Sequence, residues 1–312
     1  MRYLSVCSGM EAASVAWEPL GWSPVAFSEI EPFPSAILKH RFPNIPNYGD
    51  LTKFQQWPIG PGSIDLLVGG TPCQAFSSLG KQKGFGDART ALALSFVGLV
   101  EQSRPRWFVW ENVERCLSSN QGRDFGLFVG SLARLGYCCA WRLLDARNFG
   151  LKQRRKRLFL VGNLGTNPYR AASVFFKEVG CDGYFESPSK KEKGNPGNIN
   201  EGNKAGRVVI AFQPGNLRRK FGANPSSYSF PTLSCDSGDQ NAHFAREGEI
   251  RRITPKEAER LQGFPDDWSN IPWNGNPTSP DNLRYRACGN SMAVPVMRWI
   301  GEQIARVERE SE

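Results

Sequence analysis

The sequence predicts an α/β protein built around an open, mostly parallel sheet. Three observations lead to this prediction. The chain opens with a strand, a glycine turn and a helix; short apolar runs then alternate with helical segments; and a glycine-rich turn follows the apolar run over 64–68. With 312 residues, of which 40% are hydrophobic, the chain can form one large domain, or a large and a small one.

The first unit is a strand over 3–7, a turn at Ser8-Gly9 and a helix over 11–17. In folds that open in this way, the N-terminus of the helix faces the ligand. The other elements that the apolar pattern predicts are helices over 35–41, 90–102 and 125–135, and strands over 24–28, 64–68, 105–110, 137–144 and 157–161, with a short strand and turn over 47–51.

Acidic residues follow two of these strands. Glu29 lies 20 residues after Gly9, close to the spacing at which a carboxylate binds ribose hydroxyls in dinucleotide folds. Its structural alternative is to cap the helix that starts near Pro32. Asp50 follows a short strand, where it could accept a hydrogen bond from an adenine amino group. For Asp50 alone, a turn or helix cap is the favoured interpretation.

The run over 64–68 leads into Gly69-Gly70-Thr71-Pro72-Cys73. Two glycines allow a sharp turn, and Pro72 restricts the backbone just before the thiol. This arrangement is typical of a nucleophile at the carboxyl end of a strand; the alternative is a small buried cysteine. The basic, glycine-rich segment 80–89 is expected to be a mobile loop beside Cys73.

A further carboxylate, Glu111, follows the predicted strand over 105–110 and is a second candidate for chemistry. Residues 147–157 then carry six basic side chains and no acidic one. A solvated basic face is the usual explanation of such a run. Because the run leads into an apolar strand, alternate arginines should point to opposite faces, and some should point inward.

The composition changes at residue 163. The segment 163–250 is rich in Gly, Asn, Pro and Ser, and we expect a separate small domain or a large insertion there. Regular structure returns with Thr254, Pro255 and Glu257, which form the pattern of a capping box. A last apolar helix is expected over 293–304, with Asn290-Ser291 at its start, where capping is the default role.

Composition limits the function classes. A net charge of +9 weakly favours a polyanionic partner. Eight cysteines without a Cys-x-x-Cys pair, and only two histidines, argue against a zinc site and a disulfide framework. No apolar run could span a membrane and the N-terminus is a strand rather than a signal peptide, so we expect a cytoplasmic protein without membrane contact.

Four motifs occur in one order: Pro72-Cys73-Gln74, Glu111-Asn112-Val113, Gln153-x-Arg155-x-Arg157 and Gly289-Asn290-Ser291. On these motifs the chain resembles the DNA (cytosine-5) methyltransferases of the bacterial and phage restriction–modification type, over about 1–162 and 250–305. The resemblance implies a Rossmann-like, mixed seven-stranded sheet of the S-adenosylmethionine-dependent methyltransferases. It also implies a catalytic domain over 1–162, a smaller target-recognition domain over 163–250 and a return segment over 251–312, whose last helix packs beside the first unit.

The cofactor implied by the resemblance is S-adenosylmethionine, with S-adenosylhomocysteine as product and no metal. Its implied binding residues are Cys7, Ser8, Gly9, Met10 and Glu11 for the methionine part, Glu29 and Ile30 at the ribose, Asp50 and Leu51 at the adenine, and Pro72, Leu92, Asn290 and Ser291 around the pocket. The family usually has glycines where this chain has Glu11 and Ala12, and an aspartate where it has Ser5 or Leu4. Glu11 is therefore an alternative partner for the methionine amino group.

The resemblance also implies four catalytic residues. The Cys73 thiolate would add to carbon 6 of cytosine, a protonated Glu111 would bond N3, and Arg157 would bond O2. Arg155 would hold Glu111 or a phosphate. The target base would leave the duplex, and the segment 80–89 would close over it.

Duplex DNA is the implied partner of a monomeric enzyme, and enzymes of this type can accompany a cognate restriction endonuclease. Two alternatives stay open: the same chemistry on cytosine in tRNA, and a catalytically inactive DNA-binding relative.

Overall fold

The computed structural model describes residues 1–72, 88–176, 210–212, 243–246 and 249–310. Cys73, Gln74 and most of the segment 80–89 lie outside the described residues, so the structure does not test what we expect of them. The target-recognition segment 163–250 is described only in part.

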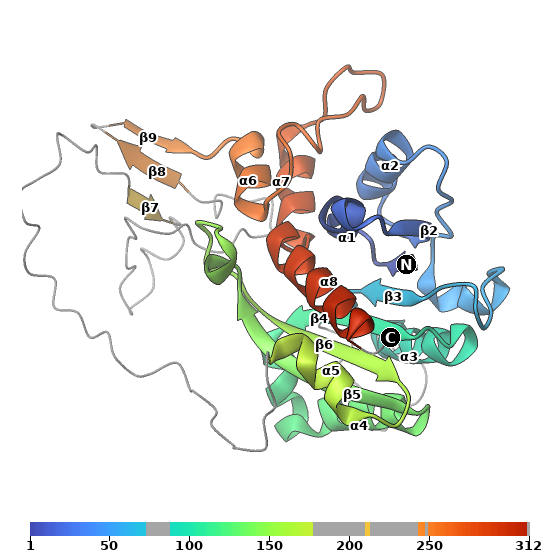
Figure 1. Ribbon diagram of the computed structural model, residues 1–312. Coiled ribbons are helices and arrows are strands. Elements are labelled where there is room, and N and C mark those ends of the chain that lie inside the picture. Colours follow the sequence, from blue (N-terminus) through green and yellow to red (C-terminus); the bar gives the residue numbers. More distant parts are fainter. Residues whose placement is uncertain (73–87, 177–209, 213–242, 247–248, 311–312) are drawn as a thin grey trace, which may run out of the picture.

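The main sheet is mixed, as expected, and has the strand order β2-β1-β3-β4-β6-β5 (Figure 1). The first four strands in this order are parallel, and β6 is antiparallel to both of its neighbours. The strands span Arg2–Val6 (β1), Ser23–Ser28 (β2), Leu66–Gly69 (β3), Trp107–Val113 (β4), Tyr137–Asp145 (β5) and Lys156–Leu164 (β6).

Six strands form this sheet among the described residues, where the sequence predicts seven. Of the short strand and turn expected over 47–51, the strand is wrong: Asn47 makes a single parallel bridge to Phe27. Gly49 then takes a φ of +72°, and Asp50 begins the 3-10 helix η2 (Leu51–Gln56) by accepting a hydrogen bond from the Thr52 amide at 2.9 Å. A turn and a cap therefore replace the strand, as the structural alternative for Asp50 predicts.

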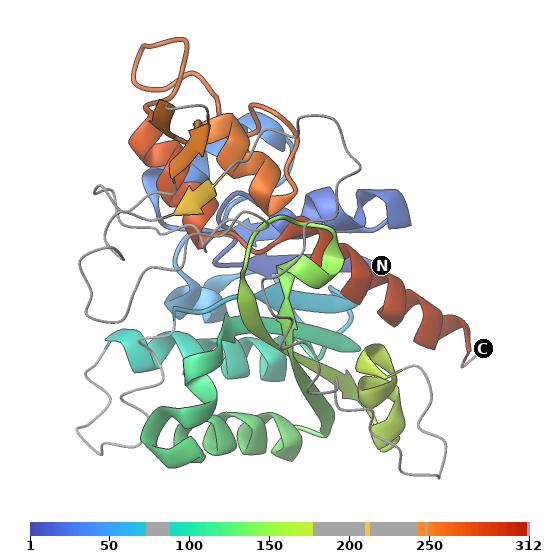
Figure 2. The ribbon, with the colours of Figure 1, turned by 90° about the vertical axis from the view of Figure 1, so that its left-hand side faces the viewer.

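Helices cover both faces of the sheet, because successive strand residues point to opposite sides. Leu4 and Val6 of β1 pack into one core with α3 (Ala88–Ser103) and α4 (Arg123–Arg134). Tyr3 packs into the other core with α1 (Ala12–Trp17) and the last helix, α8 (Val294–Arg309). Figure 2 shows α4 and α8 on opposite sides of the strands. The helices of the sheet domain are α1 (Ala12–Trp17), α2 (Pro32–Arg41), α3 (Ala88–Ser103), α4 (Arg123–Arg134) and α5 (Pro168–Phe175), with the short 3-10 turns η1 (Glu18–Leu20), η4 (Glu114–Gly122) and η5 (Ala146–Phe149).

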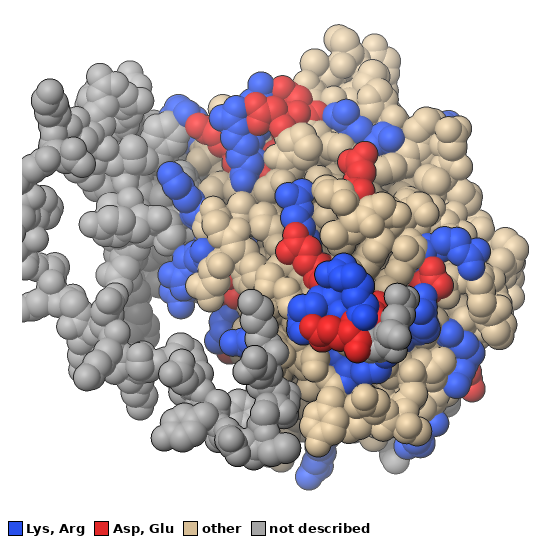
Figure 3. Space-filling model, viewed as in Figure 1, with Lys and Arg blue, Asp and Glu red and all other residues tan. Residues whose placement is uncertain are grey.

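The basic run alternates along its strand as predicted. Arg155 is 4% exposed, its neighbour Lys156 is exposed and ion-paired with Glu114 at 2.9 Å, and Arg157 is half-buried. Arg147, earlier in the run, pairs with Asp145 at 2.8 Å. In Figure 3 some of the basic side chains on the visible face likewise lie beside acidic ones, while others stand alone. Nearby carboxylates therefore balance part of the positive charge of residues 147–157.

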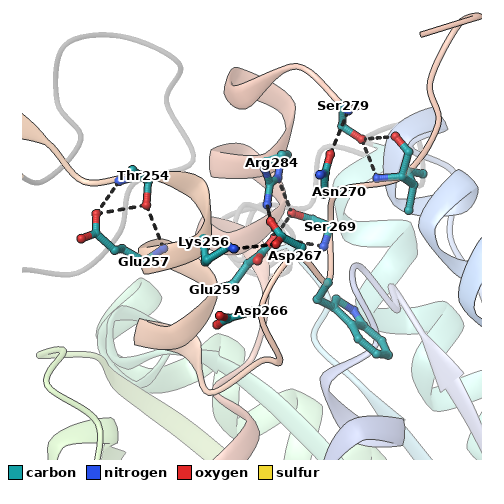
Figure 4. Close-up of polar contacts among 12 residues, drawn as sticks. Thr254, Lys256, Glu257, Glu259, Asp266, Asp267, Ser269, Asn270, Ser279 and Arg284 are labelled. Atoms are coloured by element: carbon teal, nitrogen blue, oxygen red, sulfur yellow. Dashed lines mark hydrogen bonds and ion pairs between the residues drawn. The ribbon is translucent and has the colours of Figure 1, made fainter. Parts of the chain in front are cut away.

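The chain returns to the sheet domain through α6 (Pro255–Gln262), and the predicted capping box between Thr254 and Glu257 is present (Figure 4). A buried ion pair follows: Arg284 of α7 (Asp281–Asn290) donates to Glu259 of α6 at 2.9 Å. Ser269 donates to the same carboxylate. These contacts fix the two helices against each other, since a buried carboxylate needs such partners.

The last helix, α8 (Val294–Arg309), begins within one residue of its expected start and extends past the expected end at residue 304. Asn290 ends α7 and Ser291 is the C-cap of that helix, so their expected place at the start of the last helix is wrong. Pro295, in the first turn of α8, sets the start of that helix. As the resemblance implies, α8 packs beside α1: Trp17 donates from its indole nitrogen to the Met297 carbonyl at 2.7 Å.

A second sheet of three antiparallel strands lies next to α6 in Figure 1. It consists of β7 (Ile210–Phe212), β8 (His243–Arg246) and β9 (Glu249–Arg252), and β9 leads directly into Thr254. Among the described helices, none is both long and apolar enough to cross a lipid bilayer.

Candidate active site

Glu111 lies where β4 extends past β3. The last paired residues of these strands are Trp110 and Gly69, so Glu111 is the first β4 residue beyond the shared ladder and lies beside Gly70. A Cβ atom at Gly70 would lie 3.1 Å from Glu111 Oε2 and 3.3 Å from Met292 Cε. The lack of a side chain at residue 70 therefore leaves room for the carboxyl group.

The two β4 residues that flank Glu111 hold the turn that leads to Cys73. Trp110 donates from its indole nitrogen to Thr71 Oγ1 at 3.1 Å, and Asn112 donates to the Thr71 carbonyl at 2.8 Å. Asn112 is 3% exposed; the sequence places it in a motif with Glu111 but does not reveal this role. Its signal was a buried amide in an otherwise apolar strand, where Asn is disfavoured.

Arg157 is the charged partner of Glu111. Glu111 pairs with Phe159 of β6, so Arg157, two residues away, lies diagonally on the same face. Its Nε is 3.3 Å from Glu111 Oε1, which accepts no hydrogen bond from the described residues. Burial raises the pKa of Glu111, while the charges of Arg157 and then Arg155 act to lower it. Burial is the largest of these effects, so the net shift of the Glu111 pKa is upward.

Arg155 makes its hydrogen bonds to the return segment. Its guanidinium donates to the carbonyl oxygens of Gly289 at 3.1 Å and Ser291 at 2.7 Å. Both carbonyls belong to the junction between α7 and α8. Arg155 therefore positions this junction, and its charge also acts on Glu111.

A pocket adjoins Glu111 at the carboxyl ends of β1 and β3. It holds about 390 Å³ of empty space, part of it open to solvent. The sequence-predicted residues that it brings together are Cys7, Ser8, Gly9, Glu11, Glu111, Asn290 and Ser291. Sequence reasoning missed the other lining residues: Ser5, Ala12, Ala13, Val68, Gly70 and Met292. Most of these are small or contribute backbone, so only the fold could reveal them.

Glu29 lies beside the first turn. Its Oε2 accepts a hydrogen bond from the Gly9 amide, and its Oε1 accepts one from the Glu31 amide before α2, both at 2.8 Å. Burial raises the pKa of Glu29. Each carboxylate oxygen can accept a further bond, so this structural role leaves capacity for a ligand. The next residue, Ile30, is 66% exposed.

The other predicted cofactor residues do not line this pocket. Met10 and Leu51 are buried in the two cores, and Leu92 packs against the core that contains Leu51. Asp50 caps η2, and Pro72 is the exposed residue at the end of the described turn. Their contact with the cofactor stays a prediction.

A mixed sheet with this strand order, a pocket at the ends of its parallel strands and carboxylates beside the first glycine turn agree with the Rossmann-like fold of the S-adenosylmethionine-dependent methyltransferases. The family model "C-5 cytosine-specific DNA methylase" matches residues 1–204 and 190–306. The chain therefore belongs to this family, whose members methylate carbon 5 of cytosine in DNA.

Two relatives and one solved structure illustrate the similarity. A protein of Escherichia phage P1, named a DNA N-6-adenine-methyltransferase, is 31% identical over 97% of this chain; the match spans 61% of that protein. The type II methyltransferase M2.BsuMI of Bacillus subtilis is 30% identical over 98% of this chain and 76% of its own length. The crystal structure of S. pombe Dnmt2 has the same fold, with a TM-score of 0.68 and 18% identity over 98% of this chain and 99% of that one.

Proposed function

We propose that this protein transfers a methyl group to carbon 5 of a cytosine extruded from duplex DNA, through a covalent bond between Cys73 and carbon 6. The observation that supports the proposal best is the setting of Glu111. This acid has a raised pKa and pairs with Arg157, and its neighbours Trp110 and Asn112 hold the turn two residues before Cys73.

The chemistry follows from the weakness of cytosine carbon 5 as a nucleophile. Addition of the Cys73 thiolate to carbon 6 places negative charge on carbon 5, N3 and O2. A protonated Glu111 donates a hydrogen bond to N3, and Arg157 stabilises the charge on O2. After carbon 5 has gained the methyl group, it loses its proton, and Cys73 leaves as the bond to carbon 6 breaks.

Bound S-adenosylmethionine would supply an electrophilic methyl group. The residues that line the pocket suit such a ligand. They include Gly9, whose amide bonds the Glu29 carboxylate, the buried carboxylate of Glu11, and Glu111. We propose that Cys7, Ser8, Asn290 and Ser291 complete the binding site, with Asp50 and Leu51 toward the adenine. Arg155 holds the segment that contributes Asn290 and Ser291, through its hydrogen bonds to the Gly289 and Ser291 carbonyls.

We also propose that sequence recognition resides within 163–250. The first described helix in this range, α5, contacts β5 and α8 and so belongs with the sheet domain, which narrows the recognition segment to the residues after it. Exchange of residues 177–250 for the matching segment of a related enzyme should change the methylated sequence and leave the turnover rate of the same order. An unchanged preference would place recognition elsewhere.

The direct experiment is an analysis of methylated nucleosides. Purified protein is incubated with S-adenosylmethionine carrying a labelled methyl group and with duplex DNA, tRNA or no nucleic acid, and the products are separated after digestion. We expect labelled 5-methylcytosine from DNA only. Labelled 5-methylcytosine from tRNA would favour the RNA alternative, and labelled N6-methyladenine would favour the activity named for the phage P1 relative. Binding to DNA without any label would indicate an inactive relative.

A further inference from the structure

Glu11 has an unusual backbone conformation for its residue type. It is the N-cap of α1 and takes φ 63° and ψ 63°, in the left-handed region that favours glycine. Glycine is the residue that this family usually has here. A strained residue at a pocket is a reason to look for a function of its side chain.

Hydrogen bonds from β1 and from α1 hold the Glu11 carboxylate in place. Ser5 donates to its Oε2 at 2.7 Å, and the amide and hydroxyl of Ser14 donate to its Oε1 at 3.1 and 3.0 Å. Glu11 is 1% exposed, and both Ser5 and Glu11 line the pocket. Ser5 stands at or next to the position of the aspartate that the family usually carries. The Glu11 carboxylate therefore lies within hydrogen-bond distance of Ser5, six residues earlier in the chain.

No basic side chain of the described residues pairs with Glu11. Burial, the largest cause, raises the pKa of Glu11 to about 7 despite three hydrogen bonds to the carboxylate. A buried carboxylate with hydrogen bonds but no cation is suited to a positively charged ligand group, which would complete an ion pair there.

Among the described residues, the groups around Glu11 add no competing cation. From β1, Tyr3 bonds the Ser14 hydroxyl, and burial raises the pKa of Tyr3, so that it stays neutral. Cys7 lines the same pocket as a thiol whose pKa burial raises to about 12. The other acid of the pocket is Glu111, from β4, while the α7–α8 junction contributes the uncharged Asn290, Ser291 and Met292.

We propose that Glu11 is the anionic partner of the α-ammonium group of S-adenosylmethionine and S-adenosylhomocysteine, in place of the aspartate absent from the first strand. This inference rests on the proposed cofactor site. Because only the ionised carboxylate forms the ion pair, a ligand with an ammonium group displaces a proton from Glu11 at acidic pH. Affinity for such a ligand falls as the pH drops below the pKa of the free carboxyl group.

The test compares two ligands by calorimetry. S-adenosylhomocysteine carries the ammonium group, whereas 5′-methylthioadenosine shares the nucleoside and thioether but lacks it. Between about pH 7 and about pH 5.5, we expect the Kd of S-adenosylhomocysteine to rise by about tenfold per pH unit, as for one linked proton, and that of 5′-methylthioadenosine to stay constant. A second acid such as Glu111 would affect both ligands alike.

Variants separate charge from structure. Glu11→Gln should weaken S-adenosylhomocysteine by about tenfold or more at about pH 8 and abolish its pH dependence. Glu18→Gln, an exposed acid just after α1, is the matched control and should behave as the wild type. The double variant Ser5→Asp/Glu11→Gly returns the carboxylate to the strand and a glycine to the left-handed position, and should recover most of the affinity.

Three outcomes would overturn the inference: a Glu11→Gln protein that binds S-adenosylhomocysteine as the wild type does, parallel pH profiles for the two ligands, or no recovery in the folded double variant. The proposed function fails separately. If neither ligand binds, the cofactor site itself is wrong; if both bind and DNA is methylated but the pH profiles coincide, only the role of Glu11 is wrong.

Discussion

The guanidinium of Arg155 binds the carbonyl oxygen of Ser291 at 2.7 Å, across 136 residues of sequence. Arg155 precedes β6, while Ser291 is the C-cap of α7 and lines the pocket. The sequence suggests that Arg155 holds Glu111 or a phosphate. In the structure its side chain also has a structural role. It attaches the return segment to the sheet at the point where the segment completes the pocket.

Replacement of Arg155 by alanine should destabilise the protein and weaken the cofactor site together. Two buried carbonyls would lose charge-assisted donors, and we expect the free energy of unfolding to fall by about 2–4 kcal/mol. Urea unfolding measures this loss, and calorimetry should show weaker S-adenosylhomocysteine binding. The exposed Lys152, three residues earlier, provides the control Lys152→Ala. Equal stability of the two variants would mean that Arg155 does not anchor the junction.

Replacement of Glu111 by glutamine should slow methyl transfer by about two to four orders of magnitude, the usual reach of acid–base catalysis. S-adenosylhomocysteine binding should persist, because the carboxyl group is removed without loss of volume. Since the protonated acid donates to N3, the wild-type single-turnover rate should fall as the pH rises through the raised pKa of Glu111. A Glu111→Gln protein with the wild-type rate would exclude this role.

The stability of the free protein should depend on pH through Glu11. Its pKa is 4.5 as an ordinary carboxyl group and about 7 in the fold, so its protonated form stabilises the fold below about pH 4.5 and this contribution is lost as the pH rises through 7. The change corresponds to about 3 kcal/mol. Urea unfolding across this range should therefore show a steeper loss for the wild type than for Glu11→Gln. Parallel curves would show that the pKa of Glu11 is not raised.

A methyl group at Gly70 should impair catalysis. It would lie 3.1 Å from Glu111 Oε2 and 3.3 Å from Met292 Cε, so both side chains must shift by a few tenths of an ångström. We expect Gly70→Ala to lower the single-turnover rate by about tenfold or more, because misplaced catalytic groups are costly. Gly126→Ala on the exposed side of α4, with no atom within 4 Å of the added carbon, should retain full activity. If Gly70→Ala were equally active, Glu111 would not need this space.

The sequence predicted the elements whose apolar periodicity is regular. The first strand–turn–helix unit, the alternation of buried and exposed residues along β6 and the capping box at Thr254 are all confirmed. These features depend on local chemistry: strand alternation, glycine turns and the reciprocal bonds of Thr254 and Glu257.

The sequence did not predict α7, because its buried side includes a charged residue and shows no regular apolar pattern. Arg284 faces inward and pairs with Glu259 of α6, so the helix shows no apolar stripe. Asn290 was consequently assigned to the wrong helix. The relation between Ser5 and Glu11 was hidden for a similar reason, since it appears only when the left-handed turn brings the carboxylate back to the strand.

The most direct test of the account is a covalent trap at Cys73. Duplex DNA with 5-fluorocytosine in place of cytosine is incubated with the protein and S-adenosylmethionine, and the digested complex is analysed by mass spectrometry. Fluorine on carbon 5 cannot leave as a proton does, so the covalent intermediate should persist. We predict a methylated fluorocytosine attached to the peptide that carries Cys73. Methylation of ordinary DNA by the same preparation, without any adduct at Cys73 on the fluorinated DNA, would contradict the account.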